Sequence, residues 1–194
     1  WLLVALGGAA LLRARDDMSI PRPTLAWLWV ATAPAIALLL VASASAPGWL
    51  WSTEFGGYDA LSYHLQLPKE WLAIGHARTL EHNVYSALPG FVESAYMQLM
   101  AMRGGATRAA VACQYLHAGF VVLTAWLAAR AARRWWSGSD VPVGIASPVA
   151  AVAIVATPWT IVVGSLAYNE MAVTALLAGA LLLLLERDDP AWRR

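Results

Sequence analysis

The chain has 194 residues, of which 60% are hydrophobic and 13% charged, and its formal net charge is +1. In soluble domains about a quarter of the residues are charged, and nucleic-acid-binding domains are strongly basic. The composition therefore excludes an ordinary soluble domain and argues against a nucleic-acid partner. The single cysteine, Cys113, cannot form an internal disulfide, and a free cysteine in an apolar run usually packs as a small hydrophobic residue.

Several apolar runs approach the roughly 20 residues that cross a bilayer. In chain order, we predict spans at about 1–12, 25–46, 109–129, 141–163 and 167–185. The first span is partial because the sequence opens inside an apolar run, so we expect a fragment of a longer protein. The predicted fold is all-α: a polytopic transmembrane helix bundle, with residues 1–194 forming one membrane domain.

A long loop at 51–107 separates two of these spans and collects much of the polar content. Pro68 suits the first turn of a short helix, and Gly75 suits its C-terminal cap. The apolar segment 91–102 is too short to span and is expected on the membrane surface or against the bundle. We predict interfacial anchoring by aromatic side chains, namely those of Trp49, Trp51, Trp71, Phe91 and Tyr96.

The basic residues indicate the orientation, since cytoplasmic loops are rich in lysine and arginine. Nine arginines fall in the connectors 13–23, 130–140 and 187–194, whereas the other side has only four lysines and arginines, three in the 51–107 loop and Arg108 just after it. The connectors are therefore predicted to be cytoplasmic. Both the 51–107 loop and the 163–168 turn then face outward, which places Asp59 and Glu170 on the same side of the membrane.

Asp59 follows two glycines and opens a helical pattern. Ser62, Tyr63 and Gln66 share its face at helical spacing, which forms a polar stripe headed by a carboxylate. Asp59 is a candidate catalytic residue on this basis. The alternative is that Asp59 only caps the helix, because aspartate is a favoured N-cap residue.

Glu170 opens the last apolar run. The run 171–185 covers only about 22 Å, less than the roughly 30 Å of a hydrocarbon core, so the span must reach back to Glu170. A carboxylate at the outer boundary is a candidate functional residue, and Asn169 beside it is a candidate substrate-binding residue. The alternative is a glutamate that caps the helix or extends to the interface.

Other polar side chains of the loop are candidate substrate-binding residues. His64, near Asp59, is suited to binding a metal or an anion, although a hydrogen-bonded structural role is the alternative. Lys69 and Arg78 are candidates for binding a phosphate, and Tyr63 for binding substrate. The carboxylates of Glu54, Glu81 and Glu93 compete with that of Asp59. The spacings do not match a zinc site, a P-loop or a nucleophile elbow.

Three motifs together resemble the C-type glycosyltransferases: YDALSYHLQLPKEWL, NVYSALPGFVESAYMQL and GSLAYNE before a hydrophobic helix. The family includes the protein O-mannosyltransferase, aminoarabinose transferase and RgtA/B/C/D-like groups, and the likeness extends from about Leu25 to Leu185. Members have an acidic residue in the first large outer loop, which matches Asp59. Many have a second in the next outer loop, which matches Glu170, although aspartate is the usual residue there.

The resemblance implies transfer of a sugar from a polyprenyl-phosphate donor to a glycan, lipid or protein acceptor in the cell envelope. The expected location is the bacterial inner membrane, with the 51–107 loop extracytoplasmic. Asp59 would be the general base, and Glu170 would orient the acceptor or bind a divalent cation together with Asp59. The identity of any cofactor is unknown.

Two other classes of function fit a polytopic protein. Intramembrane carboxylates also mark the ion pathways of transporters, but the polar residues here are concentrated outside the spans. A non-catalytic assembly subunit is the third class.

Overall fold

The computed structural model describes residues 26–51, 57–136 and 143–186, and all the regular structure among them is helical. The predicted span at 1–12 and the carboxylate of Glu54 lie outside these residues. The described part of the predicted 25–46 span comprises a 3₁₀ segment, η1 (Ala26–Thr32), followed by α2 (Ala33–Ser43). Pro34 lies in the first turn of α2, where its missing N–H leaves no hydrogen bond unmade.

The described residues of the 51–107 loop fold into four helical elements. A helical turn at Tyr58 continues as the π-helical η3 (Ala60–His64) and then as α3 (Gln66–Ile74). Gly75 ends α3 in the left-handed conformation, with φ of 86°, which confirms its predicted role as a cap. Next come the 3₁₀ turn η4 (Val84–Ala87) and α4 (Phe91–Arg103). α4 packs against α3 and α5, so it lies on the bundle, one of the two predicted arrangements.

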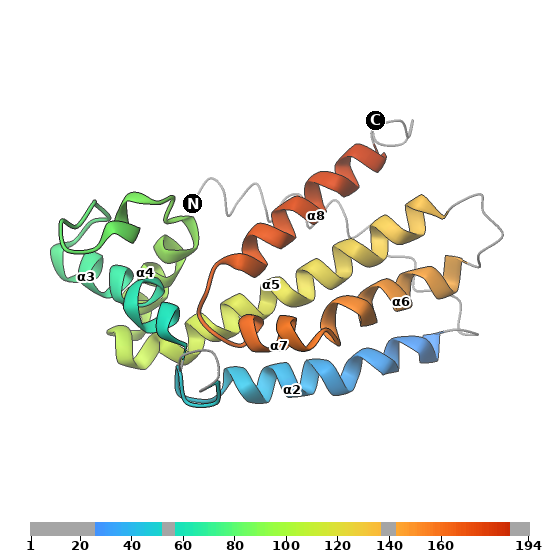
Figure 1. Ribbon diagram of the computed structural model, residues 1–194, viewed down its shortest axis with the longest axis horizontal. Coiled ribbons are helices and arrows are strands. Elements are labelled where there is room, and N and C mark those ends of the chain that lie inside the picture. The colour runs from blue at the N-terminus through green and yellow to red at the C-terminus, as the bar shows by residue number, and fades with distance from the viewer. Residues whose placement is uncertain (1–25, 52–56, 137–142, 187–194) are drawn as a thin grey trace.

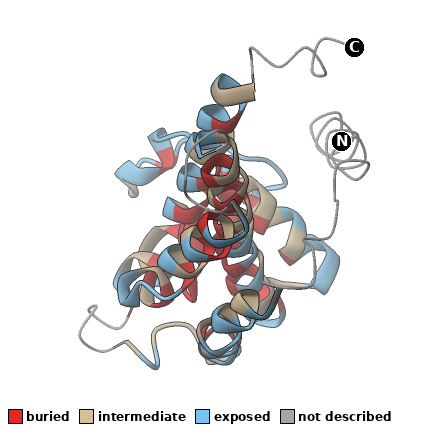
Figure 2. Cartoon of the chain, turned by 90° about the vertical axis from the view of Figure 1, so that its right-hand side faces the viewer, coloured by how far each residue is buried: buried red, intermediate tan, exposed pale blue. Residues whose placement is uncertain are grey.

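The centre of the bundle is α5 (Ala106–Trp135), a helix of 30 residues. It contacts α2, α4, α7 and most extensively α6 and α8. Figure 1 shows α5 running along the molecule, with α3 and α4 gathered at one end. Viewed along this axis in Figure 2, the buried residues lie toward the centre of the bundle.

The predicted 141–163 span is interrupted in the structure. α6 (Val143–Val155) and α7 (Pro158–Gly164) meet at an angle of 59°, because Pro158 cannot continue α6 and instead begins α7. α8 (Glu170–Glu186) has 17 residues and starts at Glu170 itself.

By length and apolar character, α5 is the one helix among the described residues that could cross a membrane alone. The bent pair α6 and α7 qualifies if it counts as a single span, and Trp27–Ser43 is apolar but shorter. Among the described residues, helix length therefore supports one candidate span, or two with the bent pair, where the sequence predicted four; the fifth predicted span, at 1–12, lies outside them.

The aromatic side chains predicted to anchor the loop differ in exposure. Trp51 is half-buried, and its Nε1 donates to Oγ of Ser165 over 2.9 Å. Trp49 is 76% exposed and Phe91 60% exposed, which agrees with an interfacial position. Trp71 and Tyr96 are buried, at 3% and 0% exposure, so the prediction was wrong for these two. Trp71 packs with Leu67 and Leu80 in the core of the loop, and Tyr96 packs between α4 and α5.

Candidate functional site

Three segments distant in sequence meet at the end of the bundle beside α4: the turn that begins at Tyr58, the start of α4, and the loop between α7 and α8. Gly57 allows the first of these to approach the others. Its φ is +66°, and a Cβ atom there would lie 3.2 Å from both Cα of Gly48 and Cδ2 of Leu166. A larger residue at 57 would therefore separate the Tyr58 turn from the α7–α8 loop.

The centre of the site is a buried pair formed by His64 and Glu93. Nδ1 of His64 lies 2.6 Å from Oε1 of Glu93, and the side chains are 1% and 5% exposed. The sequence suggested Asp59 as the acidic neighbour of His64, but the partner is Glu93, one of the competing carboxylates. Nε2 of His64 and Oε2 of Glu93 are also buried, without a hydrogen bond to any described atom.

Asp59 is helical and half-buried, and its side chain makes no capping hydrogen bond. Its described partner is Tyr63, one helical turn later. Burial raises the pKa of the Tyr63 phenol, and the charges of Asp59 and of Glu170 and a hydrogen bond with Asp59 raise it further. The two predicted catalytic carboxylates therefore act electrostatically on the same tyrosine, which argues against a purely capping role for Asp59.

Asn169 connects the α7–α8 loop to the buried pair. Its Nδ2 atom lies 3.4 Å from Oε1 of Glu93, the oxygen that also contacts His64. Its backbone N–H donates to Oε2 of Glu170 over 3.1 Å, a local contact of the kind expected for a capping glutamate. Glu170 is otherwise exposed, so its carboxylate is accessible to a ligand.

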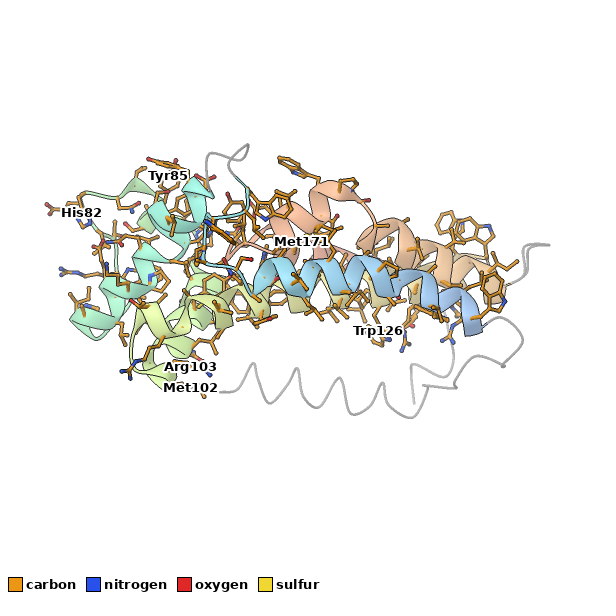
Figure 3. All side chains as sticks on the ribbon, turned by 90° about the horizontal axis from the view of Figure 1, so that it is seen from below. His82, Tyr85, Met102, Arg103, Trp126 and Met171 are labelled. Atoms are coloured by element: carbon orange, nitrogen blue, oxygen red, sulfur yellow. The ribbon has the colours of Figure 1, made fainter. Side chains whose placement is uncertain are left out.

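The remaining candidates lie apart from this cluster. Lys69 and Arg78 are exposed, and none of the described side-chain contacts joins them to Asp59, His64 or Glu170. Glu81 is also exposed. Figure 3 shows the end of the molecule where the loop residues His82 and Tyr85 lie, with Met171 nearer the middle and Trp126 toward the other end.

Aromatic rings enclose one side of the buried pair. The Tyr63 and Tyr85 rings are stacked with centroids 4.0 Å apart, and the His64 ring lies 4.1 Å from Tyr63 and 5.3 Å from Tyr168. The arrangement combines two partly accessible carboxylates, a phenol and a buried imidazole–carboxylate pair. Such a set of groups suits proton transfer to or from a hydroxyl and recognition of polar groups.

The sequence reasoning missed two residues that hold the α7–α8 loop. Tyr96 donates its hydroxyl to the backbone oxygen of Tyr168 over 2.6 Å. His117, fully buried on α5, contacts the backbone of both Leu166 and Met171. A signal was present, since a histidine in an otherwise apolar predicted span is a candidate functional residue.

Within the described parts of the chain, no group of three or more histidine, cysteine, aspartate or glutamate side chains is arranged to hold a metal ion. The expected cation bound by Asp59 and Glu170 would therefore have only two protein ligands from this set.

Comparison with known proteins finds no relative of the chain: no family model, no curated protein and no solved structure matches it. The family resemblance remains an interpretation of the sequence motifs.

Proposed function

We propose that the chain is part of a polytopic membrane glycosyltransferase, which transfers a sugar from a polyprenyl-phosphate donor to an acceptor at the outer face of the membrane. One observation carries the proposal. Asp59 lies one helical turn before Tyr63, and Glu170 follows Asn169, which contacts Glu93 of the buried His64–Glu93 pair, so two carboxylates from distant segments flank this pair. Proton transfer from an acceptor hydroxyl requires a positioned carboxylate or imidazole, and this cluster has both.

The ends of the helices support a membrane arrangement. Near one level of α5, Nε2 of Gln114 donates to the backbone oxygens of Ser43, the last residue of α2, and of Ser45 just beyond it. At this level His117 also contacts the start of α8. Near another level, Arg130 pairs with Glu186 over 3.0 Å at the end of α8. Helix ends at two common levels are expected where helices begin and end at the two faces of a bilayer.

The separation of these levels agrees with the thickness of a bilayer. At about 1.5 Å per residue, Gln114 lies about 24 Å along α5 from Arg130 and about 30 Å from Arg134, whose Nε donates to the Leu185 oxygen at the same end of α8. A hydrocarbon core is about 30 Å thick. In this arrangement the first turns of α5 project beyond the outer face and support α3 and α4. The site then lies close to the outer headgroups, and the arginines at the other end of α5 are cytoplasmic.

In the proposed reaction, Asp59 is the general base. Its carboxylate takes the acceptor hydroxyl proton while the acceptor oxygen bonds to the anomeric carbon. The bond from that carbon to the phosphate oxygen breaks, and polyprenyl phosphate leaves with the electron pair. Glu170 orients the acceptor by hydrogen bonding.

The leaving phosphate requires a positive or hydrogen-bonding partner. We proposed His64, Lys69 and Arg78 for this role from the sequence. Of the three, His64 is joined by described contacts to the other site residues but is buried, whereas Lys69 and Arg78 are exposed and therefore accessible to a phosphate. Lys69 and Arg78 would contact a donor that extends over α3.

The distribution of buried polar residues supports a transferase over a transporter. The buried polar side chains of the described residues lie mostly in the outer loop and at the outer level of the bundle. They are Ser43, His64, Ser86, Glu93, Gln114, His117, Thr124 and Ser165. A transport pathway requires polar groups along the whole thickness of the membrane. Only Thr124 of this set lies deeper along α5, and its hydroxyl bonds within its own helix.

The proposal is tested with membranes that contain the full-length protein. These are supplied with polyprenyl phosphates that carry radiolabelled mannose, glucose, galactose or aminoarabinose, and transfer of label to glycan, lipid and protein fractions is measured. We expect label from at least one donor to be transferred, and the transfer to be lost in Asp59→Asn. Absence of transfer from every donor, with the protein folded and inserted, would contradict the proposal.

A further inference from the structure

The α7–α8 loop is irregular backbone at the level where the helices end. Residues 165–169 connect α7 to α8 and include Asn169, and Glu170 follows as the first residue of α8. Backbone polar groups near the hydrocarbon region must find partners within the protein. For this loop, the partners include side chains from two other helices, Tyr96 on α4 and His117 on α5.

His117 makes two backbone contacts at once. Its Nδ1 lies 2.7 Å from the oxygen of Leu166, and its Nε2 lies 3.1 Å from the nitrogen of Met171. A carbonyl oxygen only accepts a hydrogen bond and a backbone N–H only donates one. Nδ1 therefore has the proton, Nε2 presents its lone pair, and the ring is the neutral tautomer.

We infer that His117 is a positioning residue, whose two hydrogen bonds fix Asn169 and Glu170 in place beside Tyr63 and Glu93. Leu166 is the second residue of the loop and Met171 lies in the first turn of α8, so one rigid ring ties the start of the loop to the start of α8. The Met171 bond also satisfies one of the free N–H groups in the first turn of α8. His117 does not contact the reacting groups and acts through the loop backbone.

The competing explanation is that His117 only fills space between α5 and the loop. The two roles predict different results for different substitutions. Leu fills a similar volume without either hydrogen bond. Gln has one amide group, which can accept from Met171 N–H or donate to Leu166 O but does not span both as a ring does. A positioning role predicts that Gln is intermediate between His and Leu, whereas a space-filling role predicts that Leu is tolerated best.

The experiment compares His117→Leu and His117→Gln with Thr124→Val, in full-length protein reconstituted in lipid nanodiscs. Thr124 is a matched control, because it is buried on the same helix and its hydroxyl bonds only to Phe120 of that helix. Amide hydrogen exchange is measured over the 165–172 segment. Transfer is measured as kcat and KM with the radiolabelled donor that the wild type uses.

For His117→Leu we expect faster exchange confined to the 165–172 segment and a kcat lower by about 10²-fold, since a misplacement of about 1 Å has this effect. KM should change little in His117→Leu. His117→Gln should recover part of the exchange protection and part of kcat, and Thr124→Val should resemble the wild type. Unchanged exchange in His117→Leu would overturn the inference, and so would faster exchange with an unchanged kcat.

The kinetic half of this inference rests on the proposed transferase function, and the exchange half does not. If the wild type transfers none of the sugars, the transferase proposal fails, while the exchange result still decides whether His117 holds the loop.

Discussion

Nδ1 of His64 and Oε1 of Glu93 lie 2.6 Å apart in a buried pair that joins the Tyr58 turn to the start of α4. Asn169 contacts the same carboxylate oxygen from the α7–α8 loop. A single glutamate therefore connects three segments that are distant in sequence, and the candidate site depends on it for its shape.

The first prediction concerns the stability of this pair. Removing one partner of a buried pair costs about 3–5 kcal/mol, because the other is left buried without compensation. We expect His64→Leu and Glu93→Leu to lower the free energy of unfolding by amounts of this order. The double variant should lose less than the sum of the two, with a coupling of about 0.5–3 kcal/mol. The measurement is reversible unfolding in mixed detergent micelles, and strictly additive effects would rule out the coupling.

The second prediction concerns the general base. Asp59→Asn keeps the size of the side chain and its ability to cap a helix, but removes the charge. We expect the transfer rate to fall by about 10²–10⁴-fold, with normal expression and donor binding. Glu81→Gln, at an exposed position of the same loop, is the control and should keep the wild-type rate.

Wild-type turnover in Asp59→Asn would eliminate Asp59 as the base, and Glu54 and Glu93 would be tested next. Glu170→Gln separates the roles of the two carboxylates. We expect it mainly to raise the KM for the acceptor, because Glu170 is proposed to orient that substrate. A large fall in kcat with unchanged KM in this variant would instead identify Glu170 as the base.

The third prediction follows from the raised pKa of Tyr63, whose ordinary value is 10.0. Since the folded protein holds the phenol proton more tightly than the unfolded chain, the unfolded state loses this proton first as the pH rises. The associated stability is fully present below pH 10 and is lost above it. Thermal unfolding between about pH 9 and about pH 11 should show a smaller alkaline decrease for Tyr63→Phe than for the wild type. Tyr115→Phe, at an exposed position, is the control, and an equal decrease in Tyr63→Phe and wild type would contradict the prediction.

The fourth prediction concerns topology. Single cysteines at Ala87 and Gly144, both exposed, are placed in a Cys113→Ala background, since native Cys113 is buried. In intact cells, an impermeant thiol reagent should label the cysteine at 87, in the outer loop, and leave that at 144 unlabelled until the membrane is opened. Labelling of 144 but not 87 in intact cells would reverse the orientation.

The local patterns in the sequence predicted local structure well. The helical character of the chain and the cap at Gly75 follow from backbone constraints that each residue imposes on its neighbours. The sequence also indicated that the polar loop and the turn before Glu170 contain the candidate groups. Charge, spacing and apolar run length are sufficient for such predictions because they depend on short stretches of chain.

The pairings within the site were decided by the tertiary structure. The sequence placed Asp59 near His64, but the tertiary structure pairs His64 with Glu93. The proximity of Asp59 to Tyr63, by contrast, follows from the helical spacing that the sequence predicted. Trp71 and Tyr96 likewise looked interfacial and are buried, and His117 was overlooked within an apolar run. The chemistry of a side chain determines which kinds of interaction it can make. Which partner it meets depends on contacts between helices that the sequence separates, and those contacts exist only once the segments pack together.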